Sequence, residues 1–116
     1  MLKPLNRLTK DKDFDNSFKN GRSAYDKIVG IKVVLNNKND NRFGILISTK
    51  ISKKAVDRNK IKRQIREIIK TELPLMKTGY DCVVITMPLI LGKQYGEIKA
   101  SVIGHFKKLN LYRNVS

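Results

Sequence analysis

Acidic side chains are scarce in this chain. Its 116 residues include 10 Asp and Glu against 25 Lys and Arg, and the formal net charge is +15. Such an excess of one sign destabilises the folded state by self-repulsion, so we expect a partner that neutralises it. The sequence pI near 10.2 favours nucleic acid as that partner, ahead of an anionic membrane surface.

The few carboxylates also argue against a metal-dependent nuclease. Asp11, Asp13 and Asp15 alternate along one segment, which scatters them around a helix. The pair Asp11 and Asp15 could hold a divalent ion loosely, but helix-start charge balance is the safer interpretation. The chain lacks the acidic cluster that a two-metal nuclease needs.

Cysteine and histidine are nearly absent as well. Cys82 is the single cysteine, so the chain cannot form an internal disulfide, and its apolar neighbours predict a buried, unreactive thiol. His105 is the single histidine, and a lone helical histidine is more often a packing or surface residue than a base. No Cys/His cluster has the spacing of a zinc site. These features fit a reducing, cytoplasmic setting.

Long apolar runs and glycine-rich loops are missing too. No run approaches the ~20 apolar residues that span a bilayer, and residues 1–8 lack the continuous apolar core of a secretory signal. Gly44, Gly79 and Gly92 are isolated, so neither common phosphate-binding loop is present. We therefore expect no membrane partner and no self-sufficient catalytic site.

What remains is the pattern of one small domain. The 41% hydrophobic content supports one modest core, and we expect a single RNA-binding domain over residues 1–116, with residues 1–8 and 110–116 flexible. Helices are expected at Lys10–Lys19, capped by Thr9 and ended by Gly21, at 52–72 with Ser52 as the N-cap, and at Lys93–Lys108. Strands are expected at Lys27–Leu35, Arg42–Ser48 and Tyr80–Thr86.

The order of these elements predicts the architecture. The first two strands flank a polar turn at residues 36–41, so we expect them to form an antiparallel hairpin. The third strand has a nearly continuous apolar run and is expected at the buried centre of the sheet. We also expect a parallel crossover through the helix at 52–72. Together these features predict an α/β (α+β) fold, in which one mixed sheet of three to four strands packs against helices.

The stretch at residues 52–67 is the most informative in the chain. Seven of its sixteen residues are Lys or Arg, yet on a helix at about 100° per residue an apolar stripe remains. The stripe is Ile61, Ile65, Ile68 and Ile69, and the side broadly opposite holds Asn59, Arg63, Arg66 and Lys70, with Lys62 at the border. This pattern predicts a helix that packs on the core and presents cations to a polyanion.

The cations of this region suit phosphate groups. Guanidinium forks, which can contact phosphate with two hydrogen bonds, are available at Arg58, Arg63 and Arg66. Point charges are available at Lys50, Lys53, Lys54, Lys60 and Lys62. Asn59 could bond a base edge or a sugar hydroxyl, and a local bond at the helix start is an equal alternative.

Two aromatic residues share a helical face, because Phe14 and Phe18 are four apart. Such pairs usually belong to a core, but they could instead stack on unpaired bases, worth about 1–3 kcal/mol per base. Tyr25 could act similarly. A basic helix beside exposed aromatics favours RNA with single-stranded portions over duplex DNA. The choice between core and stacking surface stays open.

Residues 58–67, Arg-Asn-Lys-Ile-Lys-Arg-Gln-Ile-Arg-Glu, closely resemble the RNR signature of the bacterial ribonuclease P protein subunits. Weaker similarities at residues 6–8, 13–21 and 44–48 extend the resemblance over nearly the whole chain. It implies a small α-β sandwich similar to the second domain of ribosomal protein S5. That fold has about four strands, three helices and a left-handed crossover through the basic helix.

The resemblance also implies a function. The family partners a large catalytic RNA, which with Mg²⁺ removes the 5′ leader from precursor tRNA, so the protein would carry no catalytic residue and no firmly bound cofactor. The positions that would face the catalytic RNA are Arg58, Asn59, Lys62, Arg63 and Arg66. Metal ligands on the protein are not identified, and DNA is not an expected partner.

The leader would lie in a cleft between the sheet and the first helix. Phe14 and Phe18 match the aromatic residues of that cleft. The chain departs from the family at two positions. Lys60 replaces the second arginine of the signature and loses its fork. Lys32 stands where some members have a strand aromatic, so a phosphate contact is expected there in place of base stacking.

Two other classes of function compete with this interpretation. A ribosomal protein or a general RNA-binding module would share the fold and the charge, but it has no reason to carry the signature at residues 58–67. A stand-alone nuclease is disfavoured because the necessary acids and metal ligands are missing.

Overall fold

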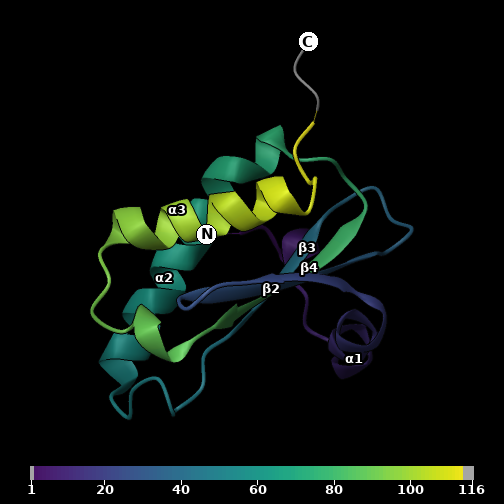
Figure 1. Ribbon diagram of the computed structural model, residues 1–116. Coiled ribbons are helices and arrows are strands. Elements are labelled where there is room, and N and C mark those ends of the chain that lie inside the picture. The colour runs from purple at the N-terminus through teal and green to yellow at the C-terminus, as the bar shows by residue number, and fades with distance from the viewer. Residues whose placement is uncertain (1, 114–116) are drawn as a thin grey trace.

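The computed structural model describes residues 2–113, and it has one sheet with helices on both faces (Figure 1). Within that range the α-helices are α1 (Asp11–Asn20), α2 (Ala55–Glu72) and α3 (Tyr95–Lys108). The strands are β1 (Arg22–Tyr25), β2 (Val29–Leu35), β3 (Arg42–Leu46) and β4 (Tyr80–Thr86). Short 3₁₀ turns are η1 (Pro4–Asn6), η2 (Leu73–Leu75) and η3 (Pro88–Ile90). The expected mixed α/β fold is confirmed.

The sheet has the strand order β1-β2-β4-β3. β2 is antiparallel to both β1 and β4, whereas β3 is parallel to β4. Cys82, Val83 and Val84 of β4 are fully buried, although successive side chains point to opposite faces. β4 therefore lies inside the sheet, as its continuous apolar run predicted, and β3 forms one edge.

The hairpin predicted around residues 36–41 is wrong. β2 and β3 are not neighbours, because β4 lies between them. β4 is apolar on both faces and takes the inner position, which a local turn signal cannot reveal. The hairpin that does form joins β1 to β2. β1 was not predicted, because Ala24 is its one buried residue and the short strand shows no apolar alternation.

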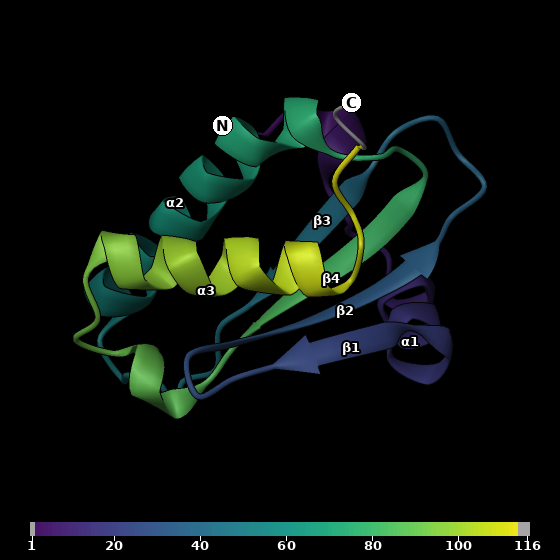
Figure 2. The ribbon, with the colours of Figure 1, turned by 45° about the horizontal axis from the view of Figure 1, so that its top comes forward.

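The helices form two layers around the sheet. α2 and α3 cover one face, and α1 packs against the other face at one end (Figures 1 and 2). Figure 2 views the sheet from the side of α2, and there β3 and β4 both run toward the lower left, with β4 below β3. When the picture is turned so that these strands point upward, β4 lies to the left of β3. The crossover β3-α2-β4 is therefore left-handed, as the family resemblance implied and against the usual right-handed rule.

The core lies between the sheet and the pair α2 and α3. The predicted stripe of α2 is buried in full: Ile61, Ile65, Ile68 and Ile69. α3 contributes Ile98, Val102 and Phe106, whereas Ile103 is only partly buried. Cys82 is buried as predicted, and the loss of solvent raises the pKa of its thiol well above the usual range.

The start of α1 differs from its prediction. The helix begins at Asp11 with Lys10 as its N-cap, and no side chain caps it, so the role assigned to Thr9 is wrong. Its end is as predicted, because Gly21 is the C-cap and its N–H donates to the carbonyl of Ser17 at 3.0 Å.

α3 begins at Tyr95, two residues after the predicted start at Lys93. The reason is a capping box that sets the first turn. The side chain of Glu97 accepts a hydrogen bond from the backbone N–H of Gln94 at 3.0 Å, and the Gln94 side chain accepts in return from the backbone of Glu97.

Both ends of the chain were expected to be flexible, but the residues described there are packed. Leu2 and Leu8 are 6% and 5% exposed, and the Leu8 N–H donates to the carbonyl of Phe43 at 2.9 Å. Leu111 is buried, and Tyr112 forms a bridge with the chain after η2. Isolated leucines in polar segments anchor both ends. Residues 1 and 114–116 lie outside the described range.

Candidate nucleic-acid interface

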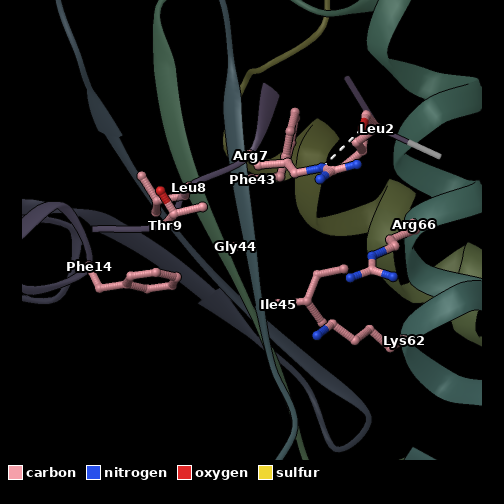
Figure 3. Close-up of a pocket in the computed structure, with 10 residues that line it drawn as sticks. All are labelled: Leu2, Arg7, Leu8, Thr9, Phe14, Phe43, Gly44, Ile45, Lys62 and Arg66. Carbon is pink, nitrogen blue, oxygen red and sulfur yellow. Dashed lines mark hydrogen bonds between the residues drawn. The ribbon is translucent and has the colours of Figure 1, made fainter. Parts of the chain in front are cut away.

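α2 turns most of its cations away from the core. Asn59, Lys60 and Arg63 are exposed, and Lys62 and Arg66 are half-buried on the side that faces β3 (Figure 3). A shallow hollow on this surface is lined by Val56, Asn59, Lys62, Arg63 and Arg66. The fold thus brings together four of the five residues predicted to face a catalytic RNA. Asn59 makes no side-chain hydrogen bond within residues 2–113, so the local alternative finds no support.

The loop before α2 adds cations at the start of the helix. Lys50, Lys53 and Lys54 are exposed there, and Lys54 is the N-cap. The first N–H groups of a helix have no partner within the helix, and they point outward beyond its N-terminal end. The positive end of the dipole of this 18-residue helix therefore adds to the side-chain charges, which makes this end attractive to anions.

Ser52 organises this loop, and its predicted role as the N-cap is wrong. Its Oγ accepts a hydrogen bond from the Lys54 N–H at 3.1 Å and donates to Oδ2 of Asp57 at 2.9 Å. Its carbonyl accepts a hydrogen bond from Nη1 of Arg58 at 2.8 Å. These bonds close a turn ahead of Ala55, where α2 begins. One nitrogen of Arg58 is therefore used within the protein.

A second surface lies on the opposite face of the sheet, beside α1. Phe18 is 38% exposed, and Nζ of Lys32 lies 5.9 Å from the centre of its ring, within range of a cation–π contact. Phe14 is half-buried, and its ring lies directly on the backbone of β3, since a Cβ added to Gly44 would be 2.4 Å from it. Neither phenylalanine belongs to the core cluster.

Tyr25 extends this surface across the sheet. It is 44% exposed, and its ring covers Gly30, where an added Cβ would be 2.0 Å away. The strand register places Ile85 beside Gly30 and Leu46 beside Ile85, so these residues share one face. Leu46 is also exposed. Aromatic and apolar side chains therefore line the sheet next to α1.

An ion-pair network ties α1 to the sheet. Nε and Nη2 of Arg42 donate to the two carboxylate oxygens of Asp81 at 2.8 and 2.6 Å, and its Nη1 donates to Oδ2 of Asp13 at 3.3 Å. Asp81 also accepts a hydrogen bond from Asn36 at 3.0 Å. The bonds to Asp81 raise the pKa of Arg42. Through Asp13 the network links α1, which carries Phe18, to the sheet.

His105 is a packing residue, as expected for a lone helical histidine. Its Nε2 lies 2.9 Å from the carbonyl of Val29 and 3.2 Å from Oδ2 of Asp26, and both neighbours are acceptors, so this nitrogen carries the proton. Ser101 donates to the same Asp26 oxygen at 2.5 Å. The serine faces the carboxylate and not the imidazole, so the three side chains are not arranged as a catalytic triad.

The described residues offer no assembled metal site. Within residues 2–113 no three His, Cys, Asp or Glu side chains are placed to share one ion. We therefore assign no metal ligand to the protein. The same range contains no helix with the length and apolar character required to cross a membrane.

Sequence reasoning missed Arg7. This residue forms a parallel bridge with Phe43 of β3, and its Nε donates to the carbonyl of Leu2 at 3.1 Å. Together with Lys62 and Arg66 it lines a cavity of about 200 Å³ beside β3 (Figure 3). A single arginine near the N-terminus carries no periodic signal, and only the fold brings it near α2.

The fold and these surfaces define a small, strongly basic α/β protein whose main surface feature is a cationic helix. The family model described as Ribonuclease P matches residues 2–110. The chain therefore belongs to the ribonuclease P protein family, and its role lies in ribonuclease P, a nuclease of tRNA processing. This confirms the resemblance drawn from residues 58–67.

Known relatives agree with this assignment. The ribonuclease P protein component of Clostridium kluyveri is 38% identical over 109 residues, which cover 92% of this chain and 96% of that protein. The one from Alkaliphilus oremlandii is 31% identical, with 95% and 96% covered. A solved Staphylococcus aureus RNase P protein, described as a mutant with defective mRNA degradation activity, is 28% identical. Its TM-score is 0.87, with 93% of this chain and 91% of that chain covered.

Proposed function

We propose that this chain binds the catalytic RNA of ribonuclease P and the 5′ leader of precursor tRNA, and that the RNA cuts the leader. The observation that carries this proposal is the accessibility of the signature side chains on α2. Within residues 2–113 the ion pairs involve Arg42 and His105 and none of the α2 cations. These cations are not neutralised inside the protein, which favours an external polyanion as their partner.

The catalytic RNA is assigned to α2 and the loop before it. Arg63 and Arg66 offer forks that suit two phosphate oxygens, and Lys53 and Lys54 add charge at the positive end of the helix. Each neutralised phosphate releases condensed counterions, so affinity should fall steeply as salt rises. Asn59 is exposed amid these cations and is available to a base edge or a ribose hydroxyl.

The leader is assigned to the surface beside α1. Phe18 offers an exposed ring on which an unpaired base can stack, and Tyr25 offers another on the same face of the sheet. The Nζ of Lys32 lies beside the Phe18 ring, where its charge suits a backbone phosphate. Phe14 supports the surface from below because its ring rests on β3.

The division of labour leaves hydrolysis to the RNA. In the assembled enzyme Mg²⁺ supplies the activation of water, and we assign no residue of this chain to hold it. We place the complex in the cytoplasm, where the single buried thiol of Cys82 would stay reduced.

Reconstitution tests the proposal. Purified protein alone should leave precursor tRNA intact, and adding the cognate RNA at low Mg²⁺ should give cleavage at the mature 5′ end. Cleavage at that site by the protein alone would disprove the division of labour. Sequencing of co-purified RNA separates the alternatives, because one discrete structured RNA supports ribonuclease P and ribosomal RNA supports a ribosomal module. An mRNA substrate belongs in the same assay, given the description of the Staphylococcus aureus structure.

A further inference from the structure

We propose that the open edge of β3 forms a binding site for one unpaired nucleotide of a single-stranded RNA, with Arg7, Lys62 and Arg66 around its phosphate. The inference rests on the proposed function only in taking RNA as the partner. It differs from that function by adding a third contact region between the two surfaces already described, and by giving a role to Arg7.

The cavity at this edge is built from three separate parts of the chain. The N-terminal segment supplies Arg7 and Thr9, β3 supplies Gly44 and Ile45, and α2 supplies its two cations. Figure 3 shows these cations extending from α2 toward Ile45, while Phe14 and Thr9 lie on the other side of the strand. The lining is mixed, with apolar side chains for a base or ribose and cations for a phosphate.

The backbone of β3 offers hydrogen-bonding groups in this cavity. Phe43 turns its carbonyl to the outer edge, where it accepts the Leu8 N–H at 2.9 Å. Along a strand the direction of the backbone groups alternates, so the N–H and carbonyl of Ile45 point to the same outer edge. Among residues 2–113 no strand or bridge continues the pairing beyond Phe43 on that side. Ile45 therefore presents the unpaired groups typical of an edge strand.

Charge decides which occupant fits this edge. A second protein strand could satisfy the backbone of Ile45, but its own backbone carries no negative charge. Arg7, Lys62 and Arg66 line the cavity, and the lining contains no carboxylate. The Nε of Arg7 is bound to the Leu2 carbonyl, which fixes the side chain and leaves its two Nη groups for a ligand. Three cations without an acid favour a phosphate group.

The position of the cavity suits a single-stranded RNA that passes from the face of the sheet beside α1 to the surface of α2. Phe14 lies between this cavity and the surface that carries Phe18, whereas Lys62 and Arg66 also line the hollow on α2. An RNA segment crossing the edge of β3 would pass from the first surface to the second without leaving the protein. One nucleotide bound at the edge would fix which part of the RNA lies on each of the two surfaces.

The test is a titration of the full chain with a short single-stranded RNA, followed by NMR of the backbone amides and by fluorescence anisotropy. We expect the Ile45 amide to shift on binding. We expect Arg7→Gln to reduce that shift and to weaken affinity about tenfold, the value typical of the removal of one charged hydrogen bond. Arg7→Lys should recover part of the affinity through its charge. Lys108→Gln, an exposed charge at the end of α3, is the matched control and should change affinity less than twofold.

Three outcomes would overturn the inference. Shifts confined to Phe18 and Lys32, or to the start of α2, with none at Ile45, would place the RNA elsewhere. A shift at Ile45 that depends on protein concentration without RNA would show a second chain pairing with β3. Equal decreases in affinity for Arg7→Gln and for the control would show that Arg7 acts only through the net charge of the protein.

A second variant keeps the test decisive if Arg7→Gln unfolds the chain. Thr9→Cys, carrying a photo-crosslinker, places a probe in the lining of the cavity, and buried Cys82 does not react with the reagent. Crosslinking of the RNA at this position supports the site, and its absence overturns it.

Discussion

At the scale of single residues, one helical turn separates two aromatic side chains with different surroundings. Phe18 is 38% exposed beside Lys32, whereas Phe14 rests on the backbone at Gly44. The sequence places both on one face of a helix, but it cannot show that the helix would cover only one end of the sheet. Burial alone distinguishes the two roles.

Replacing each phenylalanine should separate binding from stability. Phe18→Ala should weaken binding of a single-stranded leader by about 1–3 kcal/mol, the value of one stacked base, with little change in thermal unfolding. Phe14→Ala should lower the free energy of unfolding by about 1–2 kcal/mol, because roughly half of a ring is removed from its packed surroundings. Denaturation and anisotropy measure the two effects. A decrease in stability for Phe18→Ala as large as that for Phe14→Ala would contradict this assignment.

The sequence predicts the residues of α2 better than those around it. Helical periodicity alone separates the buried isoleucines from exposed Lys60 and Arg63, because one helix sets both faces. Arg7 was out of reach, since its neighbours on α2 are brought close only by the packing of the N-terminal segment on β3. Local patterns identify surfaces within an element, and tertiary contacts create the cavities between elements.

At the scale of elements, Arg42 of β3 contacts one carboxylate on β4 and another on α1. Asp81 is 2% exposed and accepts hydrogen bonds from both Nε and Nη2 of Arg42, whereas Asp13 on α1 makes a single longer contact at 3.3 Å. The two carboxylates should therefore differ greatly in their importance for stability, although both contact the same arginine.

Alanine at each carboxylate tests this difference. Asp81→Ala should lower the free energy of unfolding by about 3–5 kcal/mol, because it leaves the half-buried Arg42 charge with only the longer contact to Asp13. Asp13→Ala, at a more exposed site, should lower it by about 0.5–1 kcal/mol. Urea denaturation measures both. The same Asp13 variant should also weaken leader binding, since α1 carries Phe18; unchanged binding would show that α1 is held by other contacts.

A second link joins α3 to the turn between β1 and β2, and it should respond to acid. Partial burial alone would raise the pKa of Asp26. Hydrogen bonds from Ser101 and from the N–H groups of Val29 and Ile28, with the charge of His105, outweigh it and hold the pKa below its usual range. A carboxyl whose pKa is lowered by folding contributes stability above its unfolded pKa, and that contribution disappears as the pH falls through its folded pKa.

The variant Asp26→Asn should therefore be less stable than the natural chain at pH 7 and should lose less stability on acidification below about pH 4. Denaturation midpoints at pH 7 and pH 3 measure the difference. Asp40→Asn, in the exposed loop between β2 and β3, is the control and should preserve the acid response. If both variants show the acid response of the natural chain, Asp26 does not contribute to it.

The helices and strands themselves were largely predictable from the sequence, whereas the pairing of the strands in the sheet was not. The three helices and the strands β2, β3 and β4 match expected segments within residues 2–113 because each carries its own apolar pattern. The pairing of β2 with β4 joins distant segments, and no turn residue encodes it. The family resemblance supplied the hand of the crossover, which local physics would have assigned wrongly.

At the scale of the whole molecule, the net charge of +15 acts together with its placement. Cations are spread over the surface, but α2 and its preceding loop concentrate them where few carboxylates lie nearby. Long-range attraction should therefore depend on total charge, whereas tight RNA binding should depend on position.

The salt dependence of binding separates these contributions. Replacing Lys60 and Arg63 with Gln should reduce the slope of log affinity against log salt by about 0.9 for each phosphate that the protein no longer neutralises. Replacing Lys107 and Lys108 on α3 removes the same charge and should leave the slope nearly unchanged. Anisotropy with the cognate RNA at several salt concentrations gives both slopes. Equal slopes for the two double variants would show that charge matters and position does not.

The strand order also governs when this protein can begin to fold during synthesis. β2 and β3 leave the ribosome early, but the strand that lies between them, β4, comes only after the whole of α2. Until residues 80–86 emerge, β3 has no partner in the sheet and α2 has no complete surface on which to bury its isoleucines. Most of the chain must therefore be made before its core can close, so the sheet should form late and cooperatively, as pairing between distant segments requires.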